Sequence, residues 1–154
     1  LAKLTGNLRS KAYLYYFDYT FPWAEKMRLG AFHASDVLFV LNNVKHNIRF
    51  DNWPAYSASR ADIQMADIIS DYWVAFARRG VPDVQGQPKW QDYTEQAHHY
   101  MAFKNSEAQS AINLDPGVFD FHEKVIAMRR TRGDMSWNFF DIGLDAPLLN
   151  RVAE

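Results

Sequence analysis

Residues 12–19 read Ala-Tyr-Leu-Tyr-Tyr-Phe-Asp-Tyr, a nearly unbroken run of large apolar side chains. Successive side chains of a β-strand point to opposite faces of its sheet. A run that is apolar at odd and even positions alike is therefore typical of a strand covered on both faces. The segment predicts a buried central strand, and Phe21-Pro22-Trp23 is expected to end it.

The clearest helix lies in the middle of the chain. Apolar residues recur there at three-and-four spacing, from Ser59 or Asp62 to Arg79, and Gly80 is expected to stop the helix. Residues 42–58, which precede it, contain several turn formers and few periodic apolar positions. They predict a surface connection.

The later part of the chain predicts a second strand and a second helix. Residues 98–104 alternate well enough for a strand, with a possible hairpin to residues 111–114. Asp115-Pro116-Gly117 has the composition of a helix start, with Asp115 as the cap. The apolar stripe of that helix is expected to consist of Val118, Phe121, Val125 and Met128. Residues 134–154 are expected to pack on the body of the domain, and no form is assigned to them.

The composition fits one soluble globular domain and excludes several classes of function. The chain has 154 residues, 48% hydrophobic and 23% charged, with a formal net charge of -1. That balance gives no electrostatic reason to expect a nucleic acid or a membrane as partner. The absence of cysteine excludes disulfides and thiolate metal sites within the chain and leaves the cellular compartment open.

Two further features suggest that the chain is part of a larger unit. It begins with Leu1 rather than an initiator methionine, so we expect that it begins within a longer gene product. Aromatic residues make up 16% of the chain, more large apolar surface than we expect it to bury alone. That surface predicts neighbouring structure.

His33 is the first candidate for chemistry. A single histidine on a loop is more often structural or merely exposed than catalytic. Three observations favour a functional role: the loop follows a predicted strand, Gly30 lies three residues before the histidine, and Asp36 lies three residues after it. Functional groups of α/β sheets gather on loops beyond the carboxyl ends of strands. The residues alone leave both interpretations open.

Three separated segments together resemble the type B carboxylesterases, which include the cholinesterases and para-nitrobenzyl esterases. Residues 11–19 resemble the family's strand before the catalytic histidine, usually AYLYxFxY, and residues 30–40 resemble its histidine loop, usually G-A-x-H-x-x-E-L-x-F-V. Residues 71–104 resemble its W-x-x-F-A-x-x-G-x-P-N helix and the W-P-x-Y-x-x-M-x-F strand that follows. Asp36, Val81 and Asp83 depart from the usual residues, and the match weakens after Leu114.

The resemblance implies an α/β fold, namely the C-terminal part of an α/β-hydrolase domain, with residues 1–154 forming one segment of it. It also implies a serine carboxylesterase in which His33 is the catalytic base, acting on a small-molecule ester without a cofactor. None of the eight serines lies in a G-x-S-x-G elbow. The nucleophile, the triad acid and the oxyanion hole are therefore expected on an upstream N-terminal segment of the same enzyme, and the isolated chain is expected to be inactive.

Three further residues are candidates near His33. Asp36 is better interpreted as a group that fixes the loop than as the triad acid, because it lies only three residues away on a turning segment. Phe32 and Trp23 flank the loop and could line the ester pocket, although aromatic residues at such places belong to the core more often than to a pocket.

The other histidines predict no metal site. His98 and His99 are adjacent and would point to opposite faces of a strand, so they could not chelate one metal ion together. His46 and His122 have no suitable partner at helical spacing. A competing function stays open, a non-catalytic binding or adhesion protein on the cholinesterase-like fold, which the presence or absence of an upstream G-x-S-x-G would decide. An unrelated α/β domain would have to match all three segments by chance.

Overall fold

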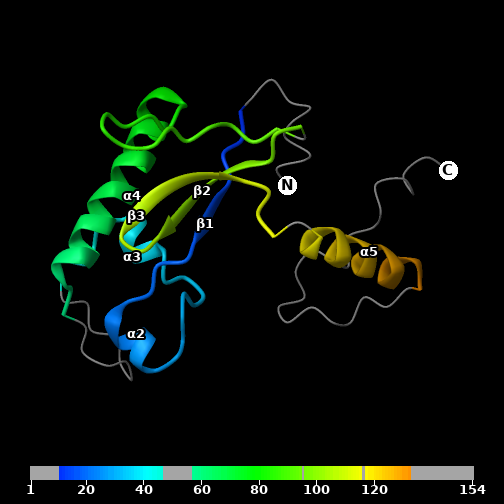
Figure 1. The fold of residues 1–154 in the computed structure, drawn as a ribbon, viewed down its shortest axis with the longest axis horizontal. Helices are drawn as coiled ribbons and strands as arrows, with labels where there is room; N and C mark the ends of the chain where they lie inside the picture. The colour runs from blue at the N-terminus through cyan, green and yellow to red at the C-terminus, as the bar shows by residue number, and fades with distance from the viewer. Residues whose placement is uncertain (1–10, 47–56, 95, 116, 133–154) are drawn as a thin grey trace. The chain divides into compact units, whose positions relative to one another are not determined.

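The predicted strands form one small mixed sheet. The computed structural model describes residues 11–46, 57–94, 96–115 and 117–132. Strand β1 (Tyr15–Phe17) pairs in parallel with β2 (His99–Lys104), which pairs antiparallel with β3 (Glu107–Ile112), giving the order β1-β2-β3 (Figure 1). The second strand thus forms where the alternating pattern predicts it, and the hairpin forms with a return strand that starts earlier than the predicted residues 111–114.

Strand β1 differs from the prediction in length and position. It covers three residues, and within the described residues it has a single neighbouring strand and lies at the end of the sheet. Tyr15 and Phe17 are half-buried, whereas Tyr16 is exposed. Within the described residues β1 is therefore a half-buried edge strand and not the buried central strand that the sequence predicts, because no second described strand pairs with its other edge.

Helix α4 (Arg60–Arg79) has the bounds that its sequence predicts. Ser59 is the N-cap, and its hydroxyl accepts from the backbone N–H of Asp62 while the Asp62 carboxylate accepts from the backbone N–H of Ser59, which completes a capping box. Gly80 ends the helix in the left-handed conformation at φ 71°, which glycine adopts without a Cβ clash.

The core lies between α4 and one face of the sheet. Its interior consists of large side chains from both layers, including Met65, Ile69, Tyr72, Met101 and Phe103. Trp90 joins them and donates its indole N–H to the Leu14 carbonyl at 3.0 Å, which fixes the segment before β1. Edge-to-face aromatic contacts recur throughout this core, for example between Tyr15 and Trp73 at 5.0 Å.

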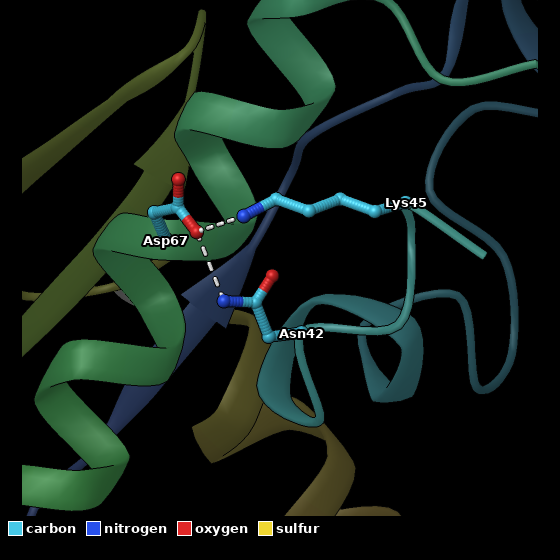
Figure 2. Close-up of polar contacts among 3 residues, drawn as sticks. All are labelled: Asn42, Lys45 and Asp67. Carbon is cyan, nitrogen blue, oxygen red and sulfur yellow. Dashed lines mark hydrogen bonds and ion pairs between the residues drawn. The ribbon is translucent and has the colours of Figure 1, made fainter.

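Two short helices lie between β1 and α4. Helix α2 (Pro22–Lys26) begins where the predicted strand was expected to end, and α3 (Val37–Val40) follows the loop that carries His33. The chain after α3 is tied to α4 by Asp67, which accepts from the Asn42 amide and the Lys45 ammonium, each at 2.9 Å (Figure 2). These bonds lower the pKa of Asp67, chiefly through Lys45.

The chain divides into two compact units, Leu1–Leu114 and Asp115–Glu154. In the second unit, α5 (Val118–Thr131) begins after Gly117, which is its N-cap without a side-chain hydrogen bond. The prediction that Asp115 caps this helix is therefore wrong. A glycine in a left-handed conformation, at φ 93°, makes the turn into the helix instead.

The predicted apolar stripe of α5 is described, whereas two other predicted segments are largely not. Val118, Phe121 and Met128 of the predicted stripe are exposed on α5 and Val125 is half-buried. Residues 134–154 and most of the predicted connection at 42–58 lie outside the described residues. No helix in the described part of the chain is long and apolar enough to cross a membrane.

Candidate functional site

The segment that carries His33 is anchored to the core before it reaches the surface. After β1 the chain buries Phe21 and Ala24. Helix α2 then ends, and the backbone N–H of Leu29 bonds to the Ala24 carbonyl at 2.9 Å. Gly30 follows at φ 59°, a left-handed conformation that favours glycine and that turns the chain toward the histidine.

His33 lies in a tight turn that leads into α3, not directly after the strand as expected. The backbone N–H of Ser35 bonds to the Phe32 carbonyl at 3.0 Å, and the N–H of Val37 bonds to the Ala34 carbonyl at 3.2 Å. The His33 side chain is exposed, and no described residue forms a hydrogen bond with its imidazole. Both ring nitrogens are thus open to partners from outside the described residues.

The backbone beside His33 is strained. Ala34 has φ 63°, in the left-handed region that a residue with a Cβ adopts at a cost of roughly 1–2 kcal/mol. Ser35 follows and is buried, with 3% of its surface exposed, and its hydroxyl has no hydrogen-bond partner within the described residues. Such a conformation persists only where the surroundings hold it.

Asp36 is held by the sheet rather than by the histidine. Its Oδ2 accepts a hydrogen bond of 2.7 Å from the Tyr15 hydroxyl on β1. Asp36 occupies the N-cap position of α3, yet its side chain forms no capping bond. Burial, together with the hydrogen bond to Asp36, raises the pKa of Tyr15 to about 12, so the phenol keeps its proton at neutral pH.

The two aromatic candidates lie on different segments. Phe32 is half-buried and contacts the buried ring of Phe21, with the ring centres 6.3 Å apart. It therefore belongs partly to the core. Trp23 lies within α2. Their predicted place in an ester pocket stays a prediction.

Tyr15 and Ser35 are the residues of this region that the sequence patterns do not single out. Tyr15 lies inside an aromatic run where it is indistinguishable from its neighbours, and its partner is 21 residues away. Ser35 lacks the flanking glycines of a nucleophile elbow, and its burial depends on tertiary contacts. No local pattern could have found either role.

An aromatic hollow of about 370 Å³ lies between β1 and α4, and its walls include neither His33 nor Phe32. The residues that line it are Lys11, Ala12, Tyr13, Tyr15, Tyr72, Trp73, Phe76, Pro82 and Trp90. Burial, followed by the charge of Asp92, raises the pKa of Tyr13 at its edge. The hollow therefore lies against the second half of α4 and the start of β1, and the His33 turn forms no part of its walls. The described residues contain no group of three or more side chains that could hold a metal ion.

A model of the carboxylesterase family matches residues 1–121. That span includes β1, the His33 turn, α4 and the β2–β3 hairpin. The chain belongs to the carboxylesterase family. The segments that resemble the family in sequence correspond in the structure to β1, to the turn with α3, and to the second half of α4 followed by β2.

Part of the fold of several solved esterases matches the fold of this chain. A Geobacillus stearothermophilus carboxylesterase is 23% identical, with a TM-score of 0.59 over 79% of this chain and 23% of its own. An esterase from anaerobic Clostridium hathewayi, which can hydrolyse aliphatic aromatic polyesters, is 23% identical, with a TM-score of 0.58 over 74% of this chain and 21% of its own. A PNB esterase is 22% identical, with a TM-score of 0.56 over 79% of this chain and 22% of its own.

These neighbours have α/β-hydrolase folds, and the small mixed sheet with its helices is part of such a fold. The chain spans about a fifth of the length of the solved structures that it matches, with 21% to 23% of each covered. A comparison with curated proteins found no match.

Proposed function

We propose that this chain supplies the general base of a serine carboxylesterase, and that His33 is that base. The observation that carries the proposal is the position of His33 in a family member: an exposed histidine on a turn that is anchored to the sheet by Tyr15 and Asp36. Family membership supports ester hydrolysis as the reaction class. The serine mechanism and the role of His33 are the proposed steps.

In this mechanism the His33 imidazole accepts the proton of a serine hydroxyl as that oxygen attacks the ester carbonyl. The tetrahedral intermediate collapses when the imidazolium returns the proton to the departing alcohol. A water molecule then repeats the sequence on the acyl-enzyme and releases the carboxylic acid. The substrate is a small-molecule ester, and no cofactor is needed for any of these proton transfers.

The serine, the oxyanion donors and the triad acid come from an upstream N-terminal segment of the same enzyme in this proposal. None of the eight serines of the chain has the flanking glycines of a nucleophile elbow. Asp36 is a poor candidate for the acid, because its carboxylate accepts from Tyr15 and no described carboxylate contacts the His33 imidazole. We call the protein that joins this chain to the upstream segment the longer protein.

The upstream segment has a suitable place to pack. The outer edge of β1 has no partner strand in the described part of the chain, and the aromatic hollow lies beside the same strand. An unpaired edge with an adjacent apolar surface is a site where a further strand can add. Packing there would cover the hollow and bring the upstream segment near β1. Tyr15 of β1 is the residue that bonds to Asp36 on the His33 turn.

The test is labelling of the longer protein with a serine-directed fluorophosphonate during hydrolysis of a short-chain aryl ester. The expected result is ester hydrolysis that stops after one equivalent of probe has bound to a serine outside this chain. His33→Ala should slow both the hydrolysis and the labelling, because both need the same base.

Two outcomes would contradict the proposal. Labelling of a serine within this chain would show that the nucleophile was misplaced. A longer protein that folds, but neither hydrolyses the ester nor reacts with the probe, would favour the non-catalytic binding protein instead.

A further inference from the structure

Tyr15 connects the sheet to the His33 turn. Its hydroxyl donates to Asp36 Oδ2 at 2.7 Å, and Asp36 lies three residues after His33. Two backbone hydrogen bonds, from the N–H groups of Ser35 and Val37, close the turn around His33 and couple the position of Asp36 to that of His33. A constraint on Asp36 is therefore a constraint on the residues just before it.

The Tyr15 hydroxyl is a fixed point because the ring beneath it is locked. The ring contacts Trp73, Trp90 and Phe103, with the centres 5.0, 6.2 and 6.3 Å away respectively. The Tyr15 backbone lies in β1, in register with Met101 of β2. A phenol held by three rings and a strand places its oxygen with little rotamer freedom.

The turn needs such a constraint. Ala34 has φ 63°, which is sterically unfavourable for a residue with a Cβ, so the turn would relax if it were released. Its described anchors are the burial of Ser35 and the carboxylate of Asp36. The Asp36 carboxylate forms no capping bond with α3, and within the described residues it accepts its hydrogen bond from Tyr15.

We infer that Tyr15 is a positioning residue for His33, which acts through Asp36 to hold the strained turn in the conformation that aims the imidazole. The inference rests on the proposed function, since it assigns Tyr15 a task in the same reaction. Tyr15 does not touch the reacting atoms. It reduces the range of orientations that His33 samples, and a small misplacement of a base lowers the rate of proton transfer.

The test compares Tyr15→Phe with Tyr19→Phe in the longer protein. Tyr19 is the matched control, because it also donates to an aspartate, Asp62, at 2.6 Å, but it does so in the core. For Tyr15→Phe we expect kcat to fall by about threefold to tenfold with KM nearly unchanged. The variant loosens the orientation of the His33 imidazole but removes no contact with the substrate. Tyr19→Phe should lower the thermal midpoint and leave kcat near wild type.

Substitutions at Asp36 test the same bond from its other end. Asp36→Ala should lower kcat about as much as Tyr15→Phe, and the double variant should lose no more than the larger single loss, because both remove one interaction. Asp36→Asn keeps an acceptor oxygen for Tyr15 and should retain more activity than Asp36→Ala.

The possible failures are distinguishable. A wild-type protein without esterase activity, or an active His33→Ala variant, defeats the proposed function itself. With those two results as expected, a Tyr15→Phe protein with kcat within twofold of wild type, or losses that multiply in the double variant, would overturn the role of Tyr15. So would a kcat loss that merely follows a reduced folded fraction in thermal unfolding.

Discussion

Two tyrosine–aspartate hydrogen bonds start four residues apart and end in different surroundings. Tyr15 donates to Asp36 at 2.7 Å on the half-buried segment that carries His33. Tyr19 donates to Asp62 at 2.6 Å, where the carboxylate is fully buried and also caps α4 together with Ser59. The pairs have the same chemistry, but one joins β1 to the turn that carries His33 and the other joins the segment after β1 to α4.

The difference separates a pair that stabilises the core from a pair that, in the proposed function, holds the catalytic base. Removal of a buried carboxylate lowers the free energy of unfolding strongly, because its hydrogen-bond partners stay buried without an acceptor. A half-buried pair can be replaced by water at small cost in stability, while the orientation of a neighbouring side chain is lost. Substitutions at the Asp62 end should therefore change unfolding, and substitutions at the Asp36 end should change kcat.

The largest effect is expected at His33 itself, because the proposed function assigns the proton transfers to this residue. His33→Ala in the longer protein should lower kcat by roughly 10⁴-fold, as loss of a triad base does. His46→Ala is the matched control, since His46 is also exposed and has no proposed role. Steady-state hydrolysis of a short-chain aryl ester measures both, and a His33→Ala protein within tenfold of wild type would exclude His33 as the base.

The next effect concerns stability and belongs to the buried pair. Asp62→Ala should lower the free energy of unfolding by about 2–4 kcal/mol, since it removes half of the capping box and leaves the Tyr19 hydroxyl without its acceptor. Denaturant unfolding of the longer protein measures this, with kcat of the folded fraction expected to stay near wild type. A loss below about 0.5 kcal/mol would show that the hydrogen bonds of Asp62 contribute little to the stability of the fold.

A smaller effect is expected at the half-buried pair. Asp36→Asn should lower kcat by roughly tenfold or less, because the residue fixes the turn, whereas removal of a true triad acid costs about 10⁴-fold. The same kinetic assay decides between the two. A loss of the larger size would show that Asp36 is the triad acid.

The smallest effect is expected at Asp67, which ties α4 to the chain after α3 through Asn42 and Lys45. The carboxylate is 48% exposed, so Asp67→Asn should destabilise the protein by only a few tenths of a kcal/mol. Because these partners depress the pKa of Asp67, its contribution is present above the unfolded value of about 3.9 and disappears as pH falls through the folded pKa. Denaturant unfolding at pH 7 and pH 3 should show a larger difference between wild type and variant at pH 7 than at pH 3.

The parts of the fold that local patterns specify could be predicted from the sequence. Helix α4 carries its own signals, with Ser59 and Asp62 at the start and Gly80 at the end, and its bounds are confirmed. The strand at 99–104 forms where the sequence predicts a strand, although three consecutive residues, Met101, Ala102 and Phe103, are buried because β2 is the middle strand of the sheet. The family resemblance, which depended on the order of three segments, is confirmed by the match over residues 1–121.

The features that depend on tertiary structure could not be predicted. The aromatic run at 12–19 indicates a strand with two apolar faces. It does not indicate how many strands pair with β1, which has one partner strand, β2, within the described residues. Asp115 has the composition of a cap, but the left-handed Gly117 takes that position. At the candidate site, the spacing of Gly30, His33 and Asp36 indicated the histidine, whereas the Tyr15 bond spans 21 residues and leaves no local pattern.

The central claim is that His33 becomes a catalytic base only when an upstream segment supplies the rest of the site. The measurement that tests it most directly is hydrolysis of a short-chain aryl ester by this chain alone and by this chain co-expressed with the upstream segment as a separate polypeptide. Alone, the chain should be poorly soluble, because an unpaired edge and uncovered aromatic side chains each worth about 1 kcal/mol favour aggregation. It should also be inactive, and activity should appear on co-expression and vanish with His33→Ala. A soluble, cooperatively folded and active monomer of this chain alone would contradict the account.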